Sequence, residues 1–328
     1  MYGHNTTQRA VVLLSVLFLG SLAFGAETWT LGKDEQWQAV SENPRARYLL
    51  EVSKLKELIN QGKTDELAGA IAKLKQDYPE IAGPDLDAYL EGDIAFAAGN
   101  FTKAVRAYDT FLARYPESPL YEAALDRELE IAQAYLSGHK KRVLRFFKIK
   151  GYAEGVRVAD KVIDRAGDTP IAIRASTAVA ESFEKRARYQ DAYERWSQIS
   201  SRWPTGETGK TALLAMARCK HAAYRGPNFD ASNLLSAKSY YENFMTRYPE
   251  DAKKYEIGKR LEQINEQLSY KQYTIAEYYE RTASDESSEI YCETIEKQWP
   301  KSTGAKRAKD IVEQIELKEQ KKEEQEKK

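Results

Sequence analysis

The chain has little of what holds small exported domains together or binds nucleic acid. It contains only 2 cysteines in 328 residues, Cys219 and Cys292, which is too few for a disulfide framework, although one bond between them stays open as an alternative. Lys and Arg together number 50, as do Asp and Glu, so the basic surplus that phosphate binding demands is missing. Glycine (18) and proline (10) are scarce, whereas Glu, Lys, Ala, Leu and Tyr are common, which favours helices throughout.

Catalytic and cofactor motifs are equally sparse. Cys219 and His221 form a weak ligand pair without an obvious third member, and no serine elbow or paired histidine supplies a base for acyl transfer. Residues 204–211 end like a phosphate-binding loop, but Pro204 stands where such a loop needs its first glycine. We predict a protein that is not an enzyme and has no cofactor, no metal and no catalytic residue. A carboxylate pair stays open as an alternative, because acidic residues are plentiful.

The single apolar run is too short to cross a bilayer, which takes about 20 apolar residues. It covers residues 10–22, follows Arg9 and precedes Ala23-Phe24-Gly25, with small side chains where a signal peptidase reads. Residues 1–25 are therefore predicted to be a cleaved signal peptide, with an uncleaved anchor helix as the alternative. No cysteine lies near the cleavage site, so we expect no lipid attachment there, and the mature protein is expected in the periplasm.

Six of the ten prolines stand at recurring points, and five of them follow an aromatic ring. The six are Pro79, Pro116, Pro170, Pro204, Pro249 and Pro300. Pro170 and Pro204 are 34 residues apart, which is the period of the tetratricopeptide repeat (TPR). The pattern predicts an all-α fold, a TPR superhelix of about five to six helix-turn-helix repeats over residues 48–316, with 26–47 as an N-terminal extension.

The skeleton between the prolines is clearest in two units, where each recurring residue has a packing role. Small residues are expected where the paired helices cross, and rings are expected to fill the space beside them. Gly99 is expected to end a helix in a left-handed cap, and Pro116 to prevent the next from continuing. The small residues are Gly92, Ala104 and Ala192, and the rings are Phe101, Tyr108, Tyr189 and Trp196.

Two insertions and a tail interrupt the repeats. Residues 138–151 are rich in basic side chains interleaved with apolar ones, which indicates either an amphipathic segment for an acidic partner or anionic lipid, or a solvated loop whose apolar members pack on the third repeat. Residues 224–230 are predicted to be an ordered turn, and 317–328 a charged helical extension or frayed end. The candidate membrane or acidic-partner contacts are Lys140, Lys141, Arg142, Arg145, Lys148 and Lys150.

The C-terminal repeats resemble the BamD family, the TPR subunits of the bacterial machine that inserts β-barrels into the outer membrane. The resemblance runs over residues 237–308 and is most specific in Leu268–Arg281, which contains Ile275-Ala276-Glu277-Tyr278-Tyr279. Weaker similarity reaches back to about Tyr48. The chain departs from the family in lacking its acylated N-terminal cysteine and in having Thr282 and Ser288 where Gly and Ala are usual.

The resemblance implies that the partners are proteins and that any membrane association is indirect, peripheral to the outer membrane. Repeats over about 236–309 would dock on a BamA-type barrel assembly subunit, and repeats over about 48–117 would bind unfolded outer-membrane protein segments or other assembly subunits. Candidate docking residues are Glu277, Tyr278, Tyr279, Glu280 and Arg281, although rings at helical spacing more often belong to a core. Two other envelope roles stay open: an adaptor for constriction or peptidoglycan synthesis, and a pilotin-like helper of a secretion pore.

Overall fold

A computed structural model describes residues 29–31, 37–39, 43–144 and 147–326. The chain divides into two compact units, residues 1–84 and 85–328. The predicted signal peptide, residues 1–25, and Arg145 lie outside the described residues.

The first unit is a helical hairpin preceded by two short strands. Strands β1 (Trp29–Leu31) and β2 (Trp37–Ala39) pair antiparallel. Helix α1 (Pro44–Gln61) begins after Asn43, whose side chain accepts from two backbone amides of the first turn, and ends at Gly62 with φ 70°. Helix α2 (Thr64–Asp77) folds back on it and buries Leu67 and Leu74.

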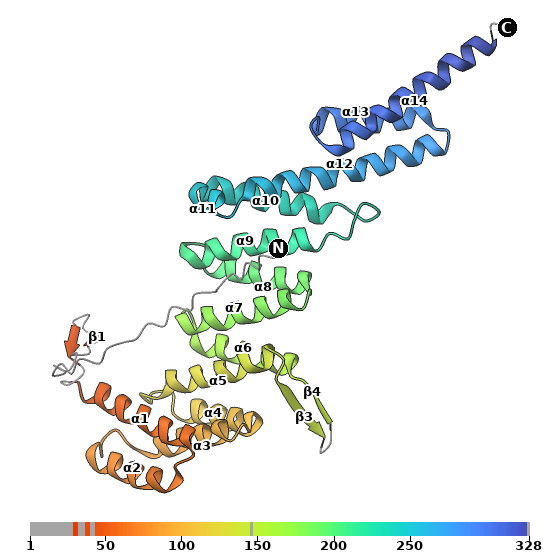
Figure 1. Cartoon of the computed structure of the whole chain (residues 1–328). Helices are drawn as coiled ribbons and strands as arrows, with labels where there is room; N and C mark the ends of the chain where they lie inside the picture. The colour runs from red at the N-terminus through yellow and green to blue at the C-terminus, as the bar shows by residue number, and fades with distance from the viewer. Residues whose placement is uncertain (1–28, 32–36, 40–42, 145–146, 327–328) are drawn as a thin grey trace, which may run out of the picture. The chain divides into compact units, whose positions relative to one another are not determined.

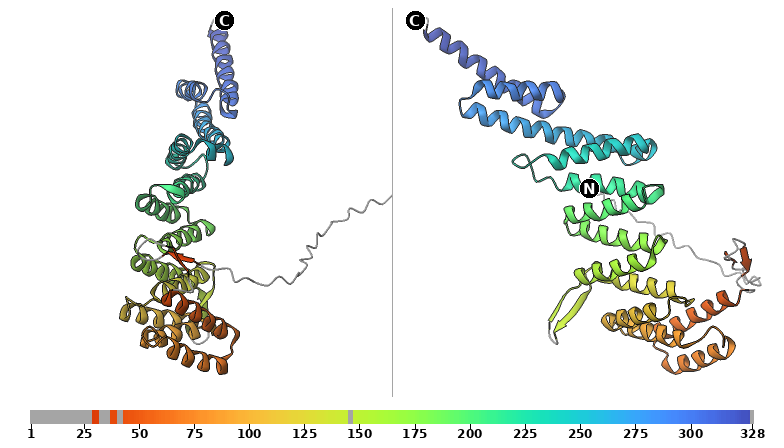
Figure 2. Two further views of the ribbon diagram at one scale, coloured as in Figure 1. Left: turned by 90° about the vertical axis from the view of Figure 1, so that its left-hand side faces the viewer. Right: turned by 180° about the vertical axis from the view of Figure 1, so that it is seen from behind.

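The second unit is a succession of helical hairpins stacked one after another (Figures 1 and 2). Its elements in chain order are α3 (Pro84–Ala97), α4 (Phe101–Arg114), α5 (Tyr121–Leu136), β3 (Lys140–Leu144), β4 (Phe147–Lys150), α6 (Tyr152–Ala166), α7 (Pro170–Lys185), α8 (Tyr189–Arg202), α9 (Gly206–Ala222), α10 (Ser232–Arg247), α11 (Pro249–Lys254), α12 (Ile257–Arg281), α13 (Asp285–Gln298) and α14 (Thr303–Glu326). The predicted all-α architecture is confirmed, with the addition of two small strand pairs.

The aromatic-proline pairs end helices as the sequence predicts. In α4, α8, α10 and α13 the ring occupies the C-cap, and its amide donates to the carbonyl four residues earlier. The φ angles of these caps lie between −127° and −136°. Pro170 differs, because it opens α7 at the first turn instead of following a helix.

The small residues and the caps also take their predicted places. Gly99 has φ +68° between α3 and α4, and Ala104 and Ala192 are fully buried. A Cβ added to Gly92 would lie 2.4 Å from the ring of Tyr108, so only glycine allows that ring to sit there. Pro204 stands in the turn between α8 and α9, as predicted.

Helix α12 is shared between two separate cores. Its first half, with Ile257 and Ile264, packs with α9 and α10, and its second half, with Ala276, packs with α13 and α14. Trp299 at the end of α13 borders both clusters. The last repeat is therefore attached chiefly through α12.

The insertion at 138–151 is a β-hairpin. Strands β3 and β4 pair antiparallel, and in Figure 1 they project away from the helices. Ile149 is 57% exposed, so the interpretation that the apolar members of this segment pack on the third repeat is wrong for that residue.

The second insertion and the described part of the tail are both ordered. The turn at 224–230 is held by Lys271, whose Nζ donates to the carbonyls of Pro227 and Phe229 at 3.0 and 2.7 Å. The tail continues α14 to Glu326. Among the described residues, no helix is long and apolar enough to span a membrane.

Candidate docking surfaces

The C-terminal part of the chain carries a large hollow beside α12. It has a volume of about 960 Å³ and lies between the first half of α12 and the turn that joins α13 to α14. Most of the residues that line it have polar side chains, and Trp299 and Pro300 are the apolar ones. The Asn265 side-chain oxygen in this wall is buried and has no hydrogen-bond partner among the described residues. The hollow exists because α13 and α14 pack on the second half of α12 and leave the first half uncovered on this side.

A second hollow of about 590 Å³ adjoins the first and shares Lys259 and Glu262 with it. Its lining includes Met245, which is 41% exposed at the end of α10. The two hollows together form a continuous surface over α10, α11 and α12, which we call the α12 surface. It lies within the segment 236–309 that the sequence predicts to dock on a partner.

Tyr278 and Tyr279 are neighbours in sequence but differ in exposure. Tyr278 is 56% exposed, so its interpretation as a core residue is wrong. Tyr279 is half-buried and stacks on Tyr291 of α13, with ring centroids 5.6 Å apart and an interplanar angle of 13°. Tyr278 is thus available for a partner, whereas Tyr279 ties α12 to α13.

The three charged candidates at the end of α12 are engaged to different degrees. Glu277 accepts a hydrogen bond from the Tyr273 hydroxyl at 3.1 Å, and Glu280 pairs with Lys318 of α14. Arg281 is exposed and makes a long contact, 3.4 Å from its Nε to the carbonyl of Glu277. The five predicted docking residues are consecutive at the end of α12, and only Tyr278 and Arg281 among them are exposed.

A cluster that the sequence reasoning missed lies one and two turns earlier on α12. The guanidinium of Arg307, from α14, lies over the rings of Tyr270 and Tyr273 at 5.6 and 5.5 Å. Two rings three residues apart on one helix face are the signal that could have indicated it.

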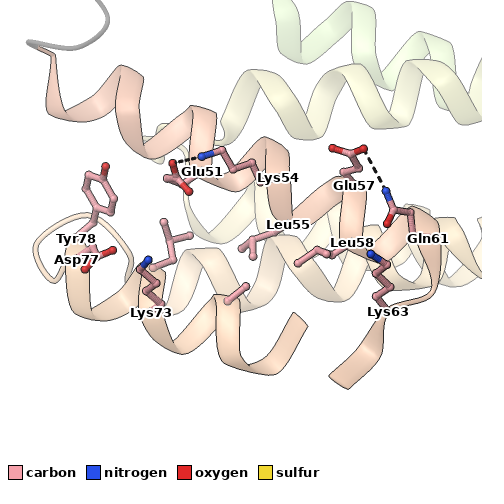
Figure 3. A pocket seen from close by; sticks show the side chains of 12 residues that line it. Glu51, Lys54, Leu55, Glu57, Leu58, Gln61, Lys63, Lys73, Asp77 and Tyr78 are labelled. Atoms are coloured by element: carbon pink, nitrogen blue, oxygen red, sulfur yellow. Dashed lines mark hydrogen bonds and ion pairs between the residues drawn. The ribbon is translucent and has the colours of Figure 1, made fainter. Parts of the chain in front are cut away.

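In the first unit, a groove of about 580 Å³ runs between α1 and α2 (Figure 3). Leu55, Leu58 and Leu74 supply its apolar part. Charged side chains of both signs surround them, including Lys54 paired to Glu51 at 2.6 Å. The groove lies within the predicted peptide-binding segment 48–117.

The described basic residues of the insertion at 138–151 lie on strands β3 and β4. Lys140 and Lys150 are exposed and pair in register, and Arg142 pairs with Lys148. Lys141, one position along, instead bonds Glu154 of α6 at 2.8 Å. A hydrogen bond from Arg157, together with this one from Lys141, lowers the pKa of Glu154 to about 2 in spite of its partial burial.

Ion pairs connect successive repeats, and the sequence reasoning did not find them. Arg127 donates from Nε to Asp93 at 2.8 Å, and Arg218 bonds Glu184 in the same way further along. Both pairs are 34 residues apart in sequence, as are Arg202 and Asp168. Opposite charges at this separation are the signal that could have indicated them, because they fall at equivalent positions of adjacent repeats.

The most buried of these charged side chains, Glu128, has a shifted pKa. Glu128 of α5 is fully buried and accepts one bond from Arg165 at 3.0 Å. Its other oxygen has no hydrogen-bond partner among the described residues. Burial raises the pKa of Glu128 to about 7, although Arg165 and Lys161 oppose the shift.

The cysteines and His221 show structural roles. Both cysteines are buried and unpaired, and burial raises the pKa of Cys219 to about 12 and that of Cys292 to about 11. His221 contacts Gln267 at 3.0 Å, and burial lowers its pKa. No cluster of three or more potential metal ligands occurs among the residues that the structure describes.

The comparison that decides the repeat type concerns α3, α4 and the turn after them. Residues 88–118 match the tetratricopeptide repeat model. Together with the stacked hairpins and their recurring caps, this match makes the fold an all-α TPR fold, a class that presents rows of side chains to other proteins.

Two solved structures match the chain at low identity and low TM-score. One is PilW, described as a widely conserved type IV pilus biogenesis factor, with 12% identity, a TM-score of 0.30 and coverage of 79% of this chain and 97% of that one. The other is the C-terminal part of a TPR repeat-containing protein from Cytophaga hutchinsonii, with 14% identity, a TM-score of 0.36 and coverage of 80% and 94%. No curated protein matches the chain significantly.

Proposed function

We propose that the chain is an exported TPR scaffold of outer-membrane β-barrel assembly, similar to BamD, and that it acts in the periplasm by binding other proteins. The observation that carries the proposal is the exposed Tyr278 at the end of the BamD-like segment, on the same helix that lines the α12 surface with its first half. An exposed aromatic ring on a repeat scaffold is a typical anchor for a protein partner.

In this proposal the α12 surface and residues 277–281 receive a BamA-type subunit. The partner would meet Tyr278 and Arg281 first, because Glu277 and Glu280 already have partners within the chain. The groove between α1 and α2 would receive an extended segment of an unfolded outer-membrane protein. Its leucines and its charges of both signs suit a strand with alternating apolar and polar residues.

The first experiment is a mild-detergent pull-down of the mature chain from envelope membranes, with mass spectrometry of the copurifying proteins. We expect a BamA-type barrel with the wild type and its loss with Tyr278→Ser combined with Arg281→Ser. The matched control is Leu235→Ser on α10, which removes an equally exposed side chain (56%) outside the proposed surface. Recovery of septal, peptidoglycan or secretin proteins in place of the barrel would reject this role and favour one of the other envelope adaptors.

The groove has its own test with a pair of leucines on α1. Leu58 lines the groove and is half-buried, whereas Leu50 is 52% exposed and does not line it. We expect Leu58→Asp to weaken binding of peptides from β-barrel strands about tenfold or more, since one lost anchor costs upwards of 1 kcal/mol. Leu50→Asp should leave binding unchanged. Equal effects of the two variants would contradict a specific groove.

A further inference from the structure

The α12 surface lies along the first half of α12, between two of the turns that join one hairpin to the next. The larger hollow is bordered by the turn between α13 and α14, at residues 298–302, and the smaller one by α11, which lies between α10 and α12. Each hollow therefore has one wall from α12 and another from an inter-repeat connection. A partner that covers both hollows contacts two successive repeats at once.

The wall of the larger hollow is fixed by contacts within the chain. The carboxylate of Glu266 accepts a hydrogen bond from the backbone amide of Thr303 at 3.0 Å, which ties the first turn of α14 to α12. Gly304 approaches α12 so closely that an added Cβ would lie 2.8 Å from the backbone of Ser269. The hollow is thus preformed, and a ligand that enters it orders few side chains, which favours binding.

The charged side chains around each hollow balance one another. Each hollow is lined by two lysines and two glutamates, which are Lys259, Lys301, Glu262 and Glu266 in the larger one and Lys253, Lys259, Glu256 and Glu262 in the smaller one. A surface with equal numbers of both signs gives no electrostatic preference for an acidic or a basic ligand. The balance therefore favours an uncharged ligand.

Uncharged groups remain to bind such a ligand. Gln263 and Gln298 are exposed carboxamides of the larger hollow, and the buried Asn265 oxygen beside them has no hydrogen-bond partner among the described residues. A carboxamide donates and accepts hydrogen bonds, as a peptide group does, so the two can pair with each other. Each hollow also offers an apolar side chain, Trp299 in the larger and Met245 in the smaller.

The conformation of the ligand follows from the same groups. A helical segment has little to offer the carboxamides, because its backbone N–H and C=O groups are bonded to one another within the helix. An extended segment keeps its main-chain donors and acceptors free. Its side chains alternate in direction, so it can also direct apolar residues into the hollows.

From these features we propose that the α12 surface binds an extended, uncharged segment of its protein partner, chiefly through the main chain of that segment. The carboxamides pair with its peptide groups, and a main-chain N–H supplies the donor that the Asn265 oxygen lacks. Met245 and Trp299 contact its apolar side chains. The inference rests on the proposed function in taking the α12 surface as the docking surface, and it adds the chemical nature of the segment that docks.

The test uses the purified mature chain and an array of uncharged, acetylated and amidated peptides. Each peptide consists of serine and threonine with two apolar residues at alternate central positions, chosen from Leu, Val, Phe and Met. Fluorescence anisotropy of labelled peptides should show binding that changes less than about twofold when salt is raised, because no ion pair is involved. N-methylation of the central peptide groups should weaken binding about tenfold or more, since it removes their donors. A helical peptide of alanine and glutamine with the same apolar residues should bind weakly.

Asn265→Leu is the decisive variant. Leucine has nearly the shape of asparagine but accepts no hydrogen bond, so the affinity for the extended peptides should fall about tenfold. Thermal stability should stay the same or rise, because this oxygen has no partner within the described part of the chain to lose. Gln314→Leu is the matched control, since it exchanges an exposed carboxamide of α14 outside both hollows and should change neither quantity.

The apolar part of the contact has a matched pair on α10. Met245→Ser removes the exposed side chain of the smaller hollow and should weaken peptide binding about tenfold. Leu235→Ser removes an exposed side chain of the same helix outside both hollows and should have no effect on binding.

Four results would overturn the inference. They are absence of binding by every peptide of the array, equal binding of the N-methylated peptides, preference for the helical peptide, and undiminished binding by Asn265→Leu. Any of them, together with a BamA-type barrel recovered in the pull-down, would reject the extended segment and leave the proposed function in place. Peptide binding with the expected losses, but no barrel in the pull-down, would retain the extended segment and reject the assembly role.

Discussion

Two hairpins of residues 85–328 share one backbone plan but differ in the side chains that pack inside them. They are α3–α4, which we call the second hairpin because it follows α1–α2 in the chain, and α12–α13, which we call the last hairpin. Both end in an aromatic cap followed by proline, and both bury a small residue at the first turn of the second helix. One turn further on, the position of Tyr108 in α4 is occupied by Cys292 in α13.

The large ring imposes requirements on its neighbours that the thiol does not. Tyr108 needs Gly92 opposite it, and its hydroxyl donates to the buried Asp93 at 2.7 Å. Cys292 is smaller, so Ala276 stands where the second hairpin has glycine. The residue after it, Glu277, is only half-buried. The second hairpin thus uses its carboxylate for its own stability, whereas the last hairpin leaves the equivalent carboxylate near the surface, within the proposed docking segment.

Removing the two equivalent carboxylates should give the largest contrast. Asp93→Ala leaves Arg127, itself 7% exposed, without its inter-repeat partner, and loss of one member of a buried ion pair costs about 3–5 kcal/mol. Glu277→Ala removes one bond to Tyr273 at a partly exposed site and should cost about 1 kcal/mol or less. Urea unfolding followed by circular dichroism, with hydrogen exchange at α3–α5, measures both. Similar losses would contradict the comparison.

Glu128 should make the stability of the α5 region depend on pH. The direction is opposite to that of an ordinary ion-paired carboxylate. Its pKa rises from an ordinary 4.5 to about 7 in the folded chain, so the folded state binds this proton more tightly than the unfolded state. Its contribution to stability is complete below pH 4.5 and is lost as pH rises through 7, a change on the order of 3 kcal/mol.

Glu128→Gln removes that titration and should flatten the stability profile between pH 4.5 and 7. Unfolding free energies of wild type and variant across this range measure the difference. Asp109, whose pKa is lowered in spite of its own burial, by hydrogen bonds from Lys161 and Arg165, titrates below the window and so supplies an internal reference. A difference between the two proteins that stays constant with pH would show that Glu128 does not titrate there.

The parts of the fold that the sequence predicted are those encoded locally. A proline after an aromatic ring stops a helix whatever surrounds it, and Gly99 adopts its left-handed cap because only glycine does so without strain. The aromatic-proline signal repeats along the chain, so the helical hairpins follow from it.

What the sequence did not predict depends on contacts between distant residues. Tyr278 and Tyr279 look alike in sequence, and only the packing of α13 decides that Tyr279 stacks while Tyr278 is exposed. The hairpin at 138–151 has mixed basic and apolar residues without a turn signal, so its strand pairing was not apparent. The pairing of Asp93 with Arg127 needs the repeat register, which the proline spacing alone does not supply.

Gly92→Ala tests the close approach directly, at a smaller expected effect. The added methyl group would lie 2.4 Å from the Tyr108 ring, and forcing extra volume into a packed core costs about 1–3 kcal/mol. Gly258→Ala is the control, because this glycine of α12 has nothing within 4 Å of the added group and should be neutral or slightly stabilised. Thermal unfolding of the two variants compares them. Equal shifts would mean that the ring of Tyr108 moves aside freely.

The smallest effect is expected at the position where the last hairpin has Ser288 and the second has Ala104. The Ser288 hydroxyl donates to the carbonyl of Ala276 at 2.9 Å in a fully buried site. That carbonyl also belongs to α12, so Ser288→Ala removes a supplementary bond and should cost about 1 kcal/mol or less in the free energy of unfolding. Ser288→Val also lacks this hydrogen bond, and in addition it adds volume where α12 and α13 cross. It should therefore cost more stability, about 1–3 kcal/mol. If the two variants lose the same stability, the hydrogen bond matters and the close packing does not. If Ser288→Val loses clearly more stability than Ser288→Ala, the position requires a small residue in both hairpins. The hydroxyl then contributes less to stability than the close packing does.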